Sequence, residues 1–331
     1  MVVQNIVTRK EYGVSQEVCD LLLYATKPRT ASQLLKRLEK HRVDKSNAKN
    51  TFSLLLNAGI LAKSGYMPFS NWLQKNWRNA LYFHEATRNQ VFADHGQNKE
   101  NEIKKGILQD YSEEGALNDF FKEYSGKHTA LPVPNTIARS FGKSLLARRT
   151  SRNFSTEEVK LVDISVILSH ALYPALKIRQ FAEENFKKNP LLLTLSEFTP
   201  FEVYMVAFNI SGLRTGVYHY NLKHHSLKLI RKGNYREVLK KIAIGQGVDD
   251  CAGVFLITSR FGRYMWRYRN SRALRNLYMD CSALAHRIVL CATGLKLRNF
   301  LTPAIKDTLA ENLLKTRFDE ESPTYLVGIG K

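Results

Sequence analysis

The second half of the chain alternates between strand patterns and helix patterns, and this alternation restricts the fold more than any other feature of the sequence. Short runs rich in β-branched and aromatic residues predict strands, and apolar residues at helical spacing predict helices. One helix is predicted behind an N-cap at Ser155 or Thr156, and a longer, mostly buried helix at 273–294. A domain of mixed α and β structure follows. The other predicted elements are strands at 201–209, 216–221, 226–231, 253–259 and 324–330 and a helix at 302–315.

Residues 15–66 carry a different pattern, in which three short amphipathic helices precede a β-turn. Leu21 in the first helix, and Leu34 and Leu38 in the second, lie at positions that give each helix one apolar face. Three such helices followed by a turn are typical of a small winged-helix domain, which we place at residues 1–66.

A winged helix on a basic protein raises the question of DNA binding, in which the third helix would enter the major groove. Recognition of base edges favours Arg, Asn or Gln. The predicted third helix carries no arginine. It has only Lys45 and Lys49 early in its run, and Asn47 and Asn50 alone are left as base-reading candidates. Docking of a peptide, or a purely packing role, therefore stays the main hypothesis for this domain, with DNA binding as the alternative.

Composition restricts the class of protein. A chain of 331 residues is long enough for one catalytic domain and a small accessory domain. The four cysteines form no CxxC pair, which predicts neither a disulfide framework nor a zinc site and fits a reducing cytoplasm. The N-terminus lacks the apolar region of a signal peptide, and no uninterrupted apolar run approaches eighteen residues. We therefore expect a cytoplasmic protein without a membrane partner.

The net charge of +20 attracts acidic partners at long range. Nucleic acid, an anionic cofactor and an acidic peptide all meet this description, and a solvated lysine-rich surface is the alternative.

Residues 67–140 are polar and rich in aromatic side chains, and we interpret them as a connecting region of helices and loops that leads into a main domain at 141–331. The prolines of the segment 131–134 predict a linker there.

The segment ARRTSRNF at 147–154 is the first candidate site. Arg148, Arg149 and Arg152 stand with the hydroxyls of Thr150 and Ser151 just before a predicted helix. Guanidinium groups, hydroxyls and free backbone N–H groups at such a position can converge on one phosphate. An exposed basic turn is the alternative.

The two histidines of the predicted hairpin turn at 224–225 have no carboxylate or cysteine at ligand spacing, so no metal site is predicted.

The same segment resembles the R-[RH]-[ST]-x-[RK]-x-[FY] opening of nitroreductase-like flavoproteins. The resemblance implies that Arg148 and Thr150 hold the phosphate of FMN and that Arg152 approaches the flavin ring. Lys331 at the end of the chain is a further candidate for the phosphate. The implied fold is α+β, with an antiparallel-rich central sheet flanked by helices, here preceded by the winged-helix domain.

Two further segments resemble the azoline oxidase branch of this family, whose members are the dehydrogenase subunits of thiazole and oxazole peptide synthetases. Pro200, Glu202, Val203 and Tyr204 match a P-x-E-V-[FY] motif, and a G-V-Y-x-Y hairpin follows at 216–220. The resemblance covers roughly residues 145–331. In the second segment, Arg267 and Tyr268 stand at a Lys-Tyr motif, Arg272 and Arg275 at two arginines, and Asp280 at an acid.

The resemblance implies that an azoline ring in a ribosomally made precursor peptide is oxidised to an azole during bacteriocin maturation. This chemistry needs a base for the ring Cα proton and an oxidised flavin. A tyrosine ordinarily titrates near pH 10, so a cationic neighbour would help it to act as a base. Tyr268 beside Arg267 is the candidate catalytic pair.

The chain departs from the branch at several flavin-facing positions. Leu195 and Ser196, after Thr194, stand where the branch has glycines, and Ser282 replaces a helix glycine. Thr194, Ser196 and Ser282 stay candidate cofactor-binding residues, although side chains at glycine positions hinder close approach. Arginine at 267 keeps the charge of lysine but cannot relay a proton.

These observations leave two functions open. The first is an FMN-dependent peptide dehydrogenase subunit of the azoline-oxidising or a trifolitoxin-like type. The second is a catalytically degenerate subunit that supports a related, flavin-bearing partner in a larger synthetase. Both predict a precursor peptide, a related dehydrogenase subunit or a cyclodehydratase as partners, and a homodimer or heterodimer with flavin sites at its interface. A nucleic-acid role for the arginine-rich run at 260–275 is the remaining alternative.

Overall fold

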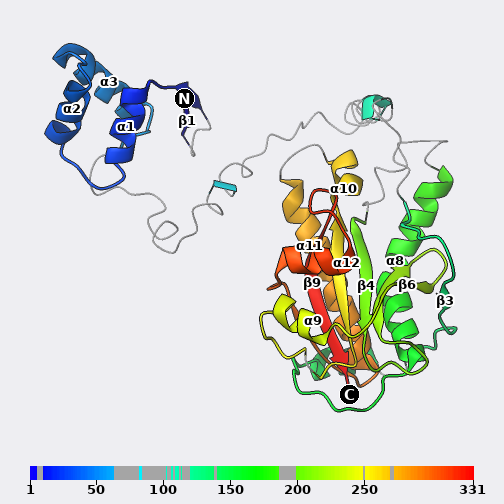
Figure 1. Cartoon of the computed structure of the whole chain (residues 1–331). Helices are drawn as coiled ribbons and strands as arrows, with labels where there is room; N and C mark the ends of the chain where they lie inside the picture. The colour runs from blue at the N-terminus through cyan, green and yellow to red at the C-terminus, as the bar shows by residue number, and fades with distance from the viewer. Residues whose placement is uncertain are drawn as a thin grey trace. The chain divides into compact units, whose positions relative to one another are not determined.

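The computed structural model describes residues 1–5, 10–62, 82–83, 102, 106, 109–111, 113, 120–137, 140–185, 199–248, 250–268 and 272–331. The chain divides into two compact units, Met1–Phe92 and Ala93–Lys331 (Figure 1).

The N-terminal unit consists of a short hairpin and three helices. Strands β1 (Val2–Gln4) and β2 (Glu11–Gly13) pair antiparallel, and α1 (Gln16–Tyr24), α2 (Ala31–Lys40) and α3 (Lys45–Asn57) follow. Helix α2 begins with a capping box, because the Thr30 hydroxyl accepts from the Gln33 N–H and the Gln33 side chain accepts from the Thr30 N–H. The Asp44 carboxylate accepts N–H groups at the start of α3.

The three predicted helices are confirmed, and Leu21, Leu34 and Leu38 are buried together with Ala48 and Leu55. The hairpin in front of them was not predicted, because each of its strands has only three residues. The β-turn that we expected after the third helix falls mainly on residues 63–66, which lie outside the described residues, so the winged-helix assignment stays a prediction.

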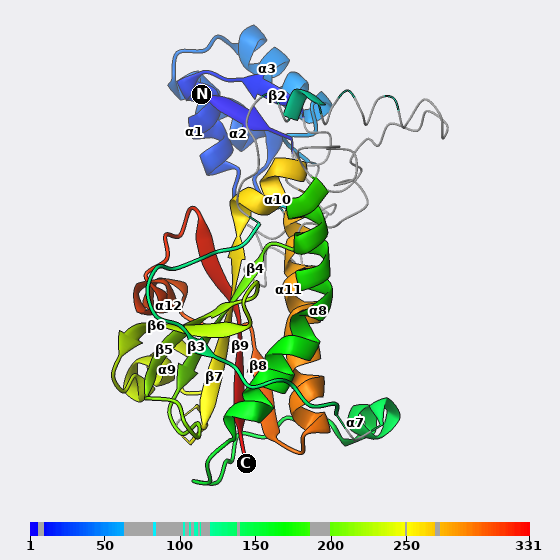
Figure 2. The same cartoon turned by 90° about the vertical axis from the view of Figure 1, so that its right-hand side faces the viewer.

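The second unit is built on one antiparallel sheet of seven strands, in the order β3-β6-β5-β4-β7-β9-β8 (Figure 2). Strand β4 lies in the middle and is buried along its whole length. The antiparallel-rich sheet that the family resemblance implied is confirmed. The strands are β3 (Thr129–Ala130), β4 (Phe201–Ala207), β5 (Gly216–Asn221), β6 (Ser226–Lys232), β7 (Gly253–Arg260), β8 (Arg298–Thr302) and β9 (Glu321–Gly330).

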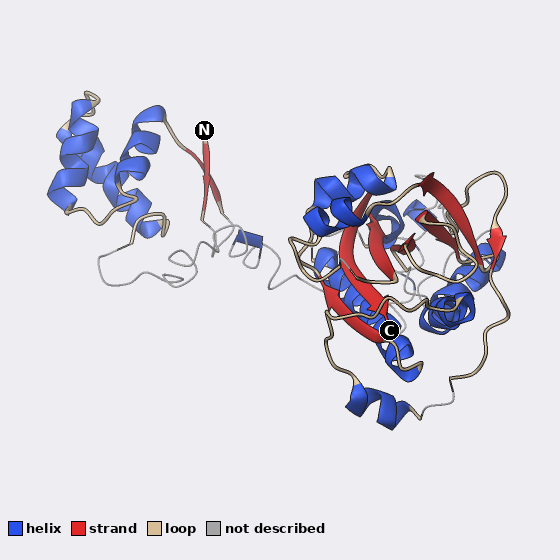
Figure 3. Cartoon of the chain, turned by 60° about the horizontal axis from the view of Figure 1, so that its bottom comes forward, coloured by secondary structure: helices blue, strands red, loops and turns tan. Residues whose placement is uncertain are grey.

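Helices cover both faces of this sheet (Figure 3). The alternation of side chains along β4 sends Val203 and Met205 to one face and Tyr204 and Val206 to the other. The first face packs against the long helices α8 (Leu161–Asn185) and α11 (Ala273–Gly294), which contact each other. The second packs against α9 (Arg236–Ile242) and α12 (Asp307–Leu314). The short helices α7 (Phe141–Ala147) and α10 (Phe261–Arg267) complete the unit.

The predicted start of the first long helix was wrong. Helix α8 begins at Leu161 rather than behind Ser155 or Thr156. Val159 instead forms a parallel bridge with Ile210, in which its N–H donates to the Asn209 carbonyl at 3.1 Å. This tertiary pairing keeps the segment before α8 extended. The arginines at 148–152 therefore do not stand at a helix N-terminus.

Helix α8 is, among the described residues, the one helix that is long and apolar enough to cross a membrane. Its apolar side chains, Ile164, Ile167 and Leu168 among them, are buried against the sheet and α11. The expectation that no spanning helix would be found rested on uninterrupted apolar runs, and α8 carries polar residues within its length.

Candidate functional site

A groove between α8 and α11 is the first feature of the candidate site. Its volume is about 140 Å³, and the small side chains of Ala171, Ala175 and Ala283 are part of its lining. An engineered apolar cavity of about 150 Å³ holds benzene, so the groove is about the size of one flat ring. The other lining residues are Pro174, Ile178, Thr199, Phe201, Asp280, Leu284 and Arg287.

Pro174 shapes one wall of the groove. Proline has no N–H, so the His170 carbonyl loses the donor that a regular helix would give it. The Arg287 guanidinium donates to this carbonyl at 3.3 Å. Arg287 therefore links α11 to α8 across the groove and is held with its cationic group at the groove's edge.

The predicted catalytic pair lies at the end of α10, close to the same groove. The Tyr268 ring stacks on Tyr264, with 4.7 Å between the ring centroids, and the Tyr264 hydroxyl donates to the Asp280 carboxylate at 3.1 Å. Asp280 lines the groove. The Arg267 guanidinium lies over the Tyr268 ring at 5.7 Å from its centroid. The structure thus brings Tyr268, Arg267 and Asp280 into one neighbourhood through Tyr264.

The other ring-binding candidates fall near the groove by position or lie outside the described residues. Ser282 is half-buried on α11, next to the lining residue Ala283. Thr194 and Ser196 belong to the undescribed segment 186–198, which ends one residue before Thr199.

The segment that carries the predicted phosphate residues lies away from the groove, beside the C-terminal end of the chain. The Ser151 N–H donates to the Asn299 carbonyl at 2.9 Å, and the Ser155 N–H donates to the Lys331 carbonyl at 2.6 Å. The segment 148–155 therefore runs beside β8 and the end of β9. Arg152 is exposed, with its guanidinium 5.5 Å from the Phe300 ring centroid.

The remaining phosphate candidates are Arg148, Arg149, Thr150 and Lys331. Arg148 is half-buried at the C-terminal end of α7, and Thr150 is exposed. The Arg149 guanidinium donates to the Leu146 carbonyl at 3.0 Å. The Lys331 ammonium pairs with Glu157 at 3.5 Å.

The phosphate candidates and the neighbourhood of Tyr268 lie at opposite ends of the sheet. Strand β9 begins at Glu321, paired with Arg260 at the start of α10, and ends at Gly330, next to Lys331. A strand of this length spans about 30 Å. The phosphate candidates and Tyr268 of one chain therefore do not converge on one point.

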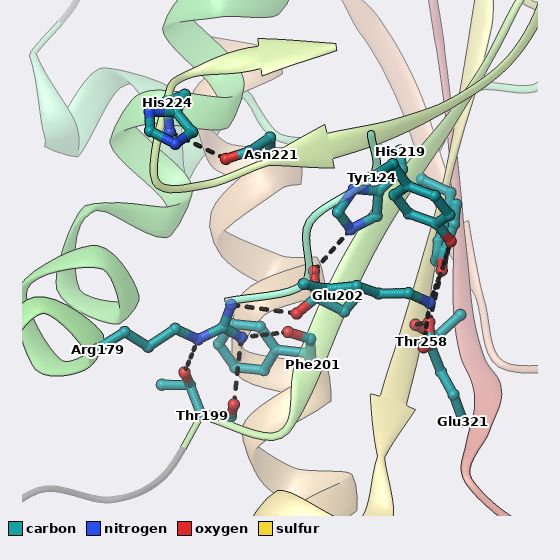
Figure 4. Close-up of polar contacts among 12 residues, drawn as sticks. Tyr124, Arg179, Thr199, Phe201, Glu202, His219, Asn221, His224, Thr258 and Glu321 are labelled. Atoms are coloured by element: carbon teal, nitrogen blue, oxygen red, sulfur yellow. Dashed lines mark hydrogen bonds and ion pairs between the residues drawn. The ribbon is translucent and has the colours of Figure 1, made fainter. Parts of the chain in front are cut away.

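A buried ion cluster behind the groove was not predicted as part of the site (Figure 4). The Glu202 carboxylate accepts from Arg263 at 2.5 Å, from Arg179 at 3.2 Å and from His219 at 2.8 Å. All four side chains are buried. Glu202 had been noted as a motif residue, but its partners come from three other elements, and nothing in its sequence neighbourhood identifies them.

Electrostatics keep Glu202 ionised. Burial by itself raises the pKa of a carboxyl group, but Arg263 and Arg179, with the hydrogen bond from His219, hold the pKa of Glu202 well below its ordinary value of 4.5. The Nδ1 atom of His219 is buried and has no hydrogen-bond partner among the residues that the structure describes. Because an ionised carboxylate only accepts, His219 donates through Nε2, which leaves Nδ1 as the bare acceptor when the ring is neutral.

A second buried carboxylate lies on the same face of the sheet. Glu321 accepts from Lys122 at 2.5 Å, from Tyr204 at 2.8 Å and from Thr258 at 2.7 Å. Lys122 belongs to the segment before β3, so this cluster fastens that segment to the sheet. No group of three or more His, Cys, Asp or Glu residues suited to a metal ion occurs in the part of the chain that the structure describes.

The Glu202 cluster predicts how acid affects stability. Because its folded-state pKa is lowered, Glu202 stabilises the protein above about pH 4.5, and this contribution is lost as the pH falls towards the lower folded-state pKa. Glu202→Gln should therefore reduce the free energy of unfolding at pH 7, by about 3 to 5 kcal/mol for a broken buried pair. The difference from wild type should shrink between pH 5 and pH 3 in urea unfolding curves. An unchanged difference across that range would contradict the assignment.

The sequence model of the nitroreductase family matches residues 145–331, and the chain belongs to that family. The resemblance inferred from the sequence is thereby confirmed.

Two relatives come from the trifolitoxin operon of Rhizobium leguminosarum bv. trifolii. The chain is 28% identical over 302 residues to trifolitoxin operon protein TfxC. This match covers 87% of the chain and 83% of TfxC. It is 32% identical over 122 residues to trifolitoxin-processing protein TfxB, covering 35% of this chain and 32% of that protein.

Among solved structures, a nitroreductase-type protein from Anabaena variabilis superposes with a TM-score of 0.52 at 19% identity. The match covers 74% of this chain but only 49% of the Anabaena chain. At this identity the likeness concerns the fold alone.

Proposed function

We propose that this chain is an FMN-dependent dehydrogenase subunit that oxidises a ribosomally synthesised precursor peptide. The observation that carries the proposal is the neighbourhood of Tyr268, Arg267 and Asp280 beside a ring-sized groove. Membership of the nitroreductase family and the similarity to a trifolitoxin operon protein along 87% of the chain support it.

The residues present fit FMN chemically. A phosphate dianion needs several cationic or hydroxyl donors, and the segment around Arg148, Thr150 and Arg152, with Lys331 near it, supplies them. Backbone lies close to this segment, since a Cβ on Gly247 would come within 2.6 Å of the Arg152 Cβ. Bound FMN would supply the oxidant that accepts a hydride from the peptide.

Binding of the ring and transfer of its proton would fall to the chain's own residues. The small side chains of the groove leave room for one flat ring between α8 and α11. Tyr268 accepts the ring Cα proton, with the Arg267 guanidinium favouring its anionic form. Asp280 orients the Tyr264 hydroxyl and so the tyrosine stack.

A specific observation favours a partner subunit. The phosphate residues and Tyr268 of one chain lie near opposite ends of β9, a strand that spans about 30 Å. We propose that a complete site combines the two halves across a homodimer or heterodimer. A chain with altered glycine positions then serves as the supporting half in the second candidate function.

The N-terminal unit is proposed as a winged-helix-like module that docks the precursor peptide rather than DNA. A groove of about 480 Å³ lies between β2 with the start of α1 and helix α3, and Leu54 projects beside it with more than half of its surface exposed. This volume is in the range of ligand pockets.

The phosphate assignment predicts the behaviour of Arg148→Ala. Loss of one charge-assisted contact, about 1.5 to 3 kcal/mol, should lower FMN affinity roughly tenfold or more. FMN released on denaturation and the visible spectrum measure retention, for the chain alone and co-expressed with its partner. Arg317→Ala, which removes an exposed arginine near the other end of β9, is the control and should retain FMN. Equal retention in both variants would contradict the phosphate role.

The base assignment predicts the behaviour of Tyr268→Phe. The change keeps the ring packed on Tyr264 but removes the ionisable oxygen, so turnover should fall about 100-fold or more with unchanged stability. Oxidation of the precursor peptide by the reconstituted complex is followed by mass. Tyr173→Phe, on an exposed face of α8, is the control. Full turnover by Tyr268→Phe would place the base on the partner and favour the supporting role.

The docking assignment predicts a change in KM. Leu54→Lys should raise the KM for the precursor peptide about tenfold by burying a charge in the groove, while kcat stays the same. Leu23→Lys changes a more exposed leucine of α1 that does not line the groove, and should leave KM unchanged. A KM that moves equally in both variants would count against docking at this groove.

A further inference from the structure

One carboxylate oxygen joins α8 to α10, the helix that carries the tyrosine stack. Oε1 of Glu202 accepts from Arg179 on α8 at 3.2 Å and from Arg263 on α10 at 2.5 Å. Both guanidinium groups are buried, and Glu202 itself lies in the central strand. The position of α10 relative to α8 is therefore set through β4 by ion pairs that solvent screens little.

Arg179 extends this link to the floor of the groove. Its Nε donates to the Thr199 hydroxyl at 2.8 Å and its Nη2 to the Thr199 carbonyl at 3.2 Å and to the Phe201 carbonyl. Thr199 and Phe201, which Figure 4 shows beside Arg179, both belong to the lining of the groove. The cluster thus fixes the backbone that enters β4 as well as the side chain of α8.

Helix α10 needs such an anchor. It has seven residues and no side-chain cap, and a helix this short is marginal without tertiary packing. Its start is held by backbone bonds from Arg260 to Pro200 and from Phe261 to Glu320. Arg263 is its buried ionic contact to the sheet, one helical turn before Arg267 and Tyr268.

We propose that Glu202 is a positioning residue, which sets the place of α10 through Arg263 and thereby places Tyr268 beside the groove. The role of Tyr268 in this statement rests on the proposed function; the anchoring of α10 does not. A misplacement of about 1 Å at a reacting group can cost 100-fold in rate, so the anchor matters although it touches no substrate.

The test compares three variants of the full chain. Glu202→Gln keeps the shape but removes the charge, and Glu202→Asp keeps the charge on a stem that is one methylene shorter. Glu321→Gln is the matched control, because it also removes a buried carboxylate charge from the same face, but one that is held by Lys122, Tyr204 and Thr258.

Amide hydrogen exchange of residues 261–268 is the first measurement, taken relative to α11 and β7 in the same protein. Exchange should rise tenfold or more in Glu202→Gln, less in Glu202→Asp, and not selectively in Glu321→Gln. If Glu202→Gln does not fold, Glu202→Asp must show the selective rise by itself. A rise shared equally with α11 and β7, or equally present in Glu321→Gln, would overturn the proposal.

Peptide oxidation is the second measurement. Glu202→Gln should lower kcat about 10- to 100-fold with a smaller change in KM, Glu202→Asp should recover part of the loss, and Glu321→Gln should retain wild-type kcat. An unchanged kcat in a Glu202→Gln protein whose α10 exchanges faster would separate the anchor from catalysis and overturn the placement of Tyr268. If the wild-type complex oxidises no peptide, the proposed function fails, while the exchange result still decides whether Glu202 anchors α10.

Discussion

The burial of β4 on both faces is the constraint on which the rest of the main unit depends. A strand in this position has no access to water, so each polar side chain that it carries must find partners inside the protein. Glu202 finds them in α8, α10 and β5, and Tyr204 finds them in Glu321 and Lys122. The satisfaction of two buried polar groups therefore determines where several peripheral elements attach.

Parts of this arrangement follow from the sequence. The strand at 216–221 and the helix at 273–294 were predicted with their observed bounds, because each is a continuous pattern bounded by turn residues. The start of α8 was missed because Val159 pairs with a distant loop. Helix α10 was missed because it is a seven-residue run of mostly aromatic and basic residues that contains Gly262 and has no side-chain cap. Strand β8, with Arg298 and Asn299, lacks the apolar run that would have identified it.

The candidate site, like the fold, could be predicted from the sequence only in part. The adjacency of Arg267 and Tyr268 is a property of the sequence, and the family resemblance gave it a meaning. The contact of Tyr264 with Asp280 spans 16 residues and that of Arg263 with Glu202 spans 61, and no spacing rule connects such positions. The separation of the phosphate residues from Tyr268 could also not be inferred, because it depends on which end of β9 each segment meets.

The bond between Arg287 and the His170 carbonyl has a consequence for selectivity at the groove. The guanidinium occupies a backbone acceptor that Pro174 leaves without its helical donor. A ligand anion that draws Arg287 to itself must leave that carbonyl to water, because Pro174 has no N–H to offer it. Binding of negative charge at the groove is thus thermodynamically coupled to the backbone of α8, and weakly interacting anions compete with an intramolecular acceptor that is always present.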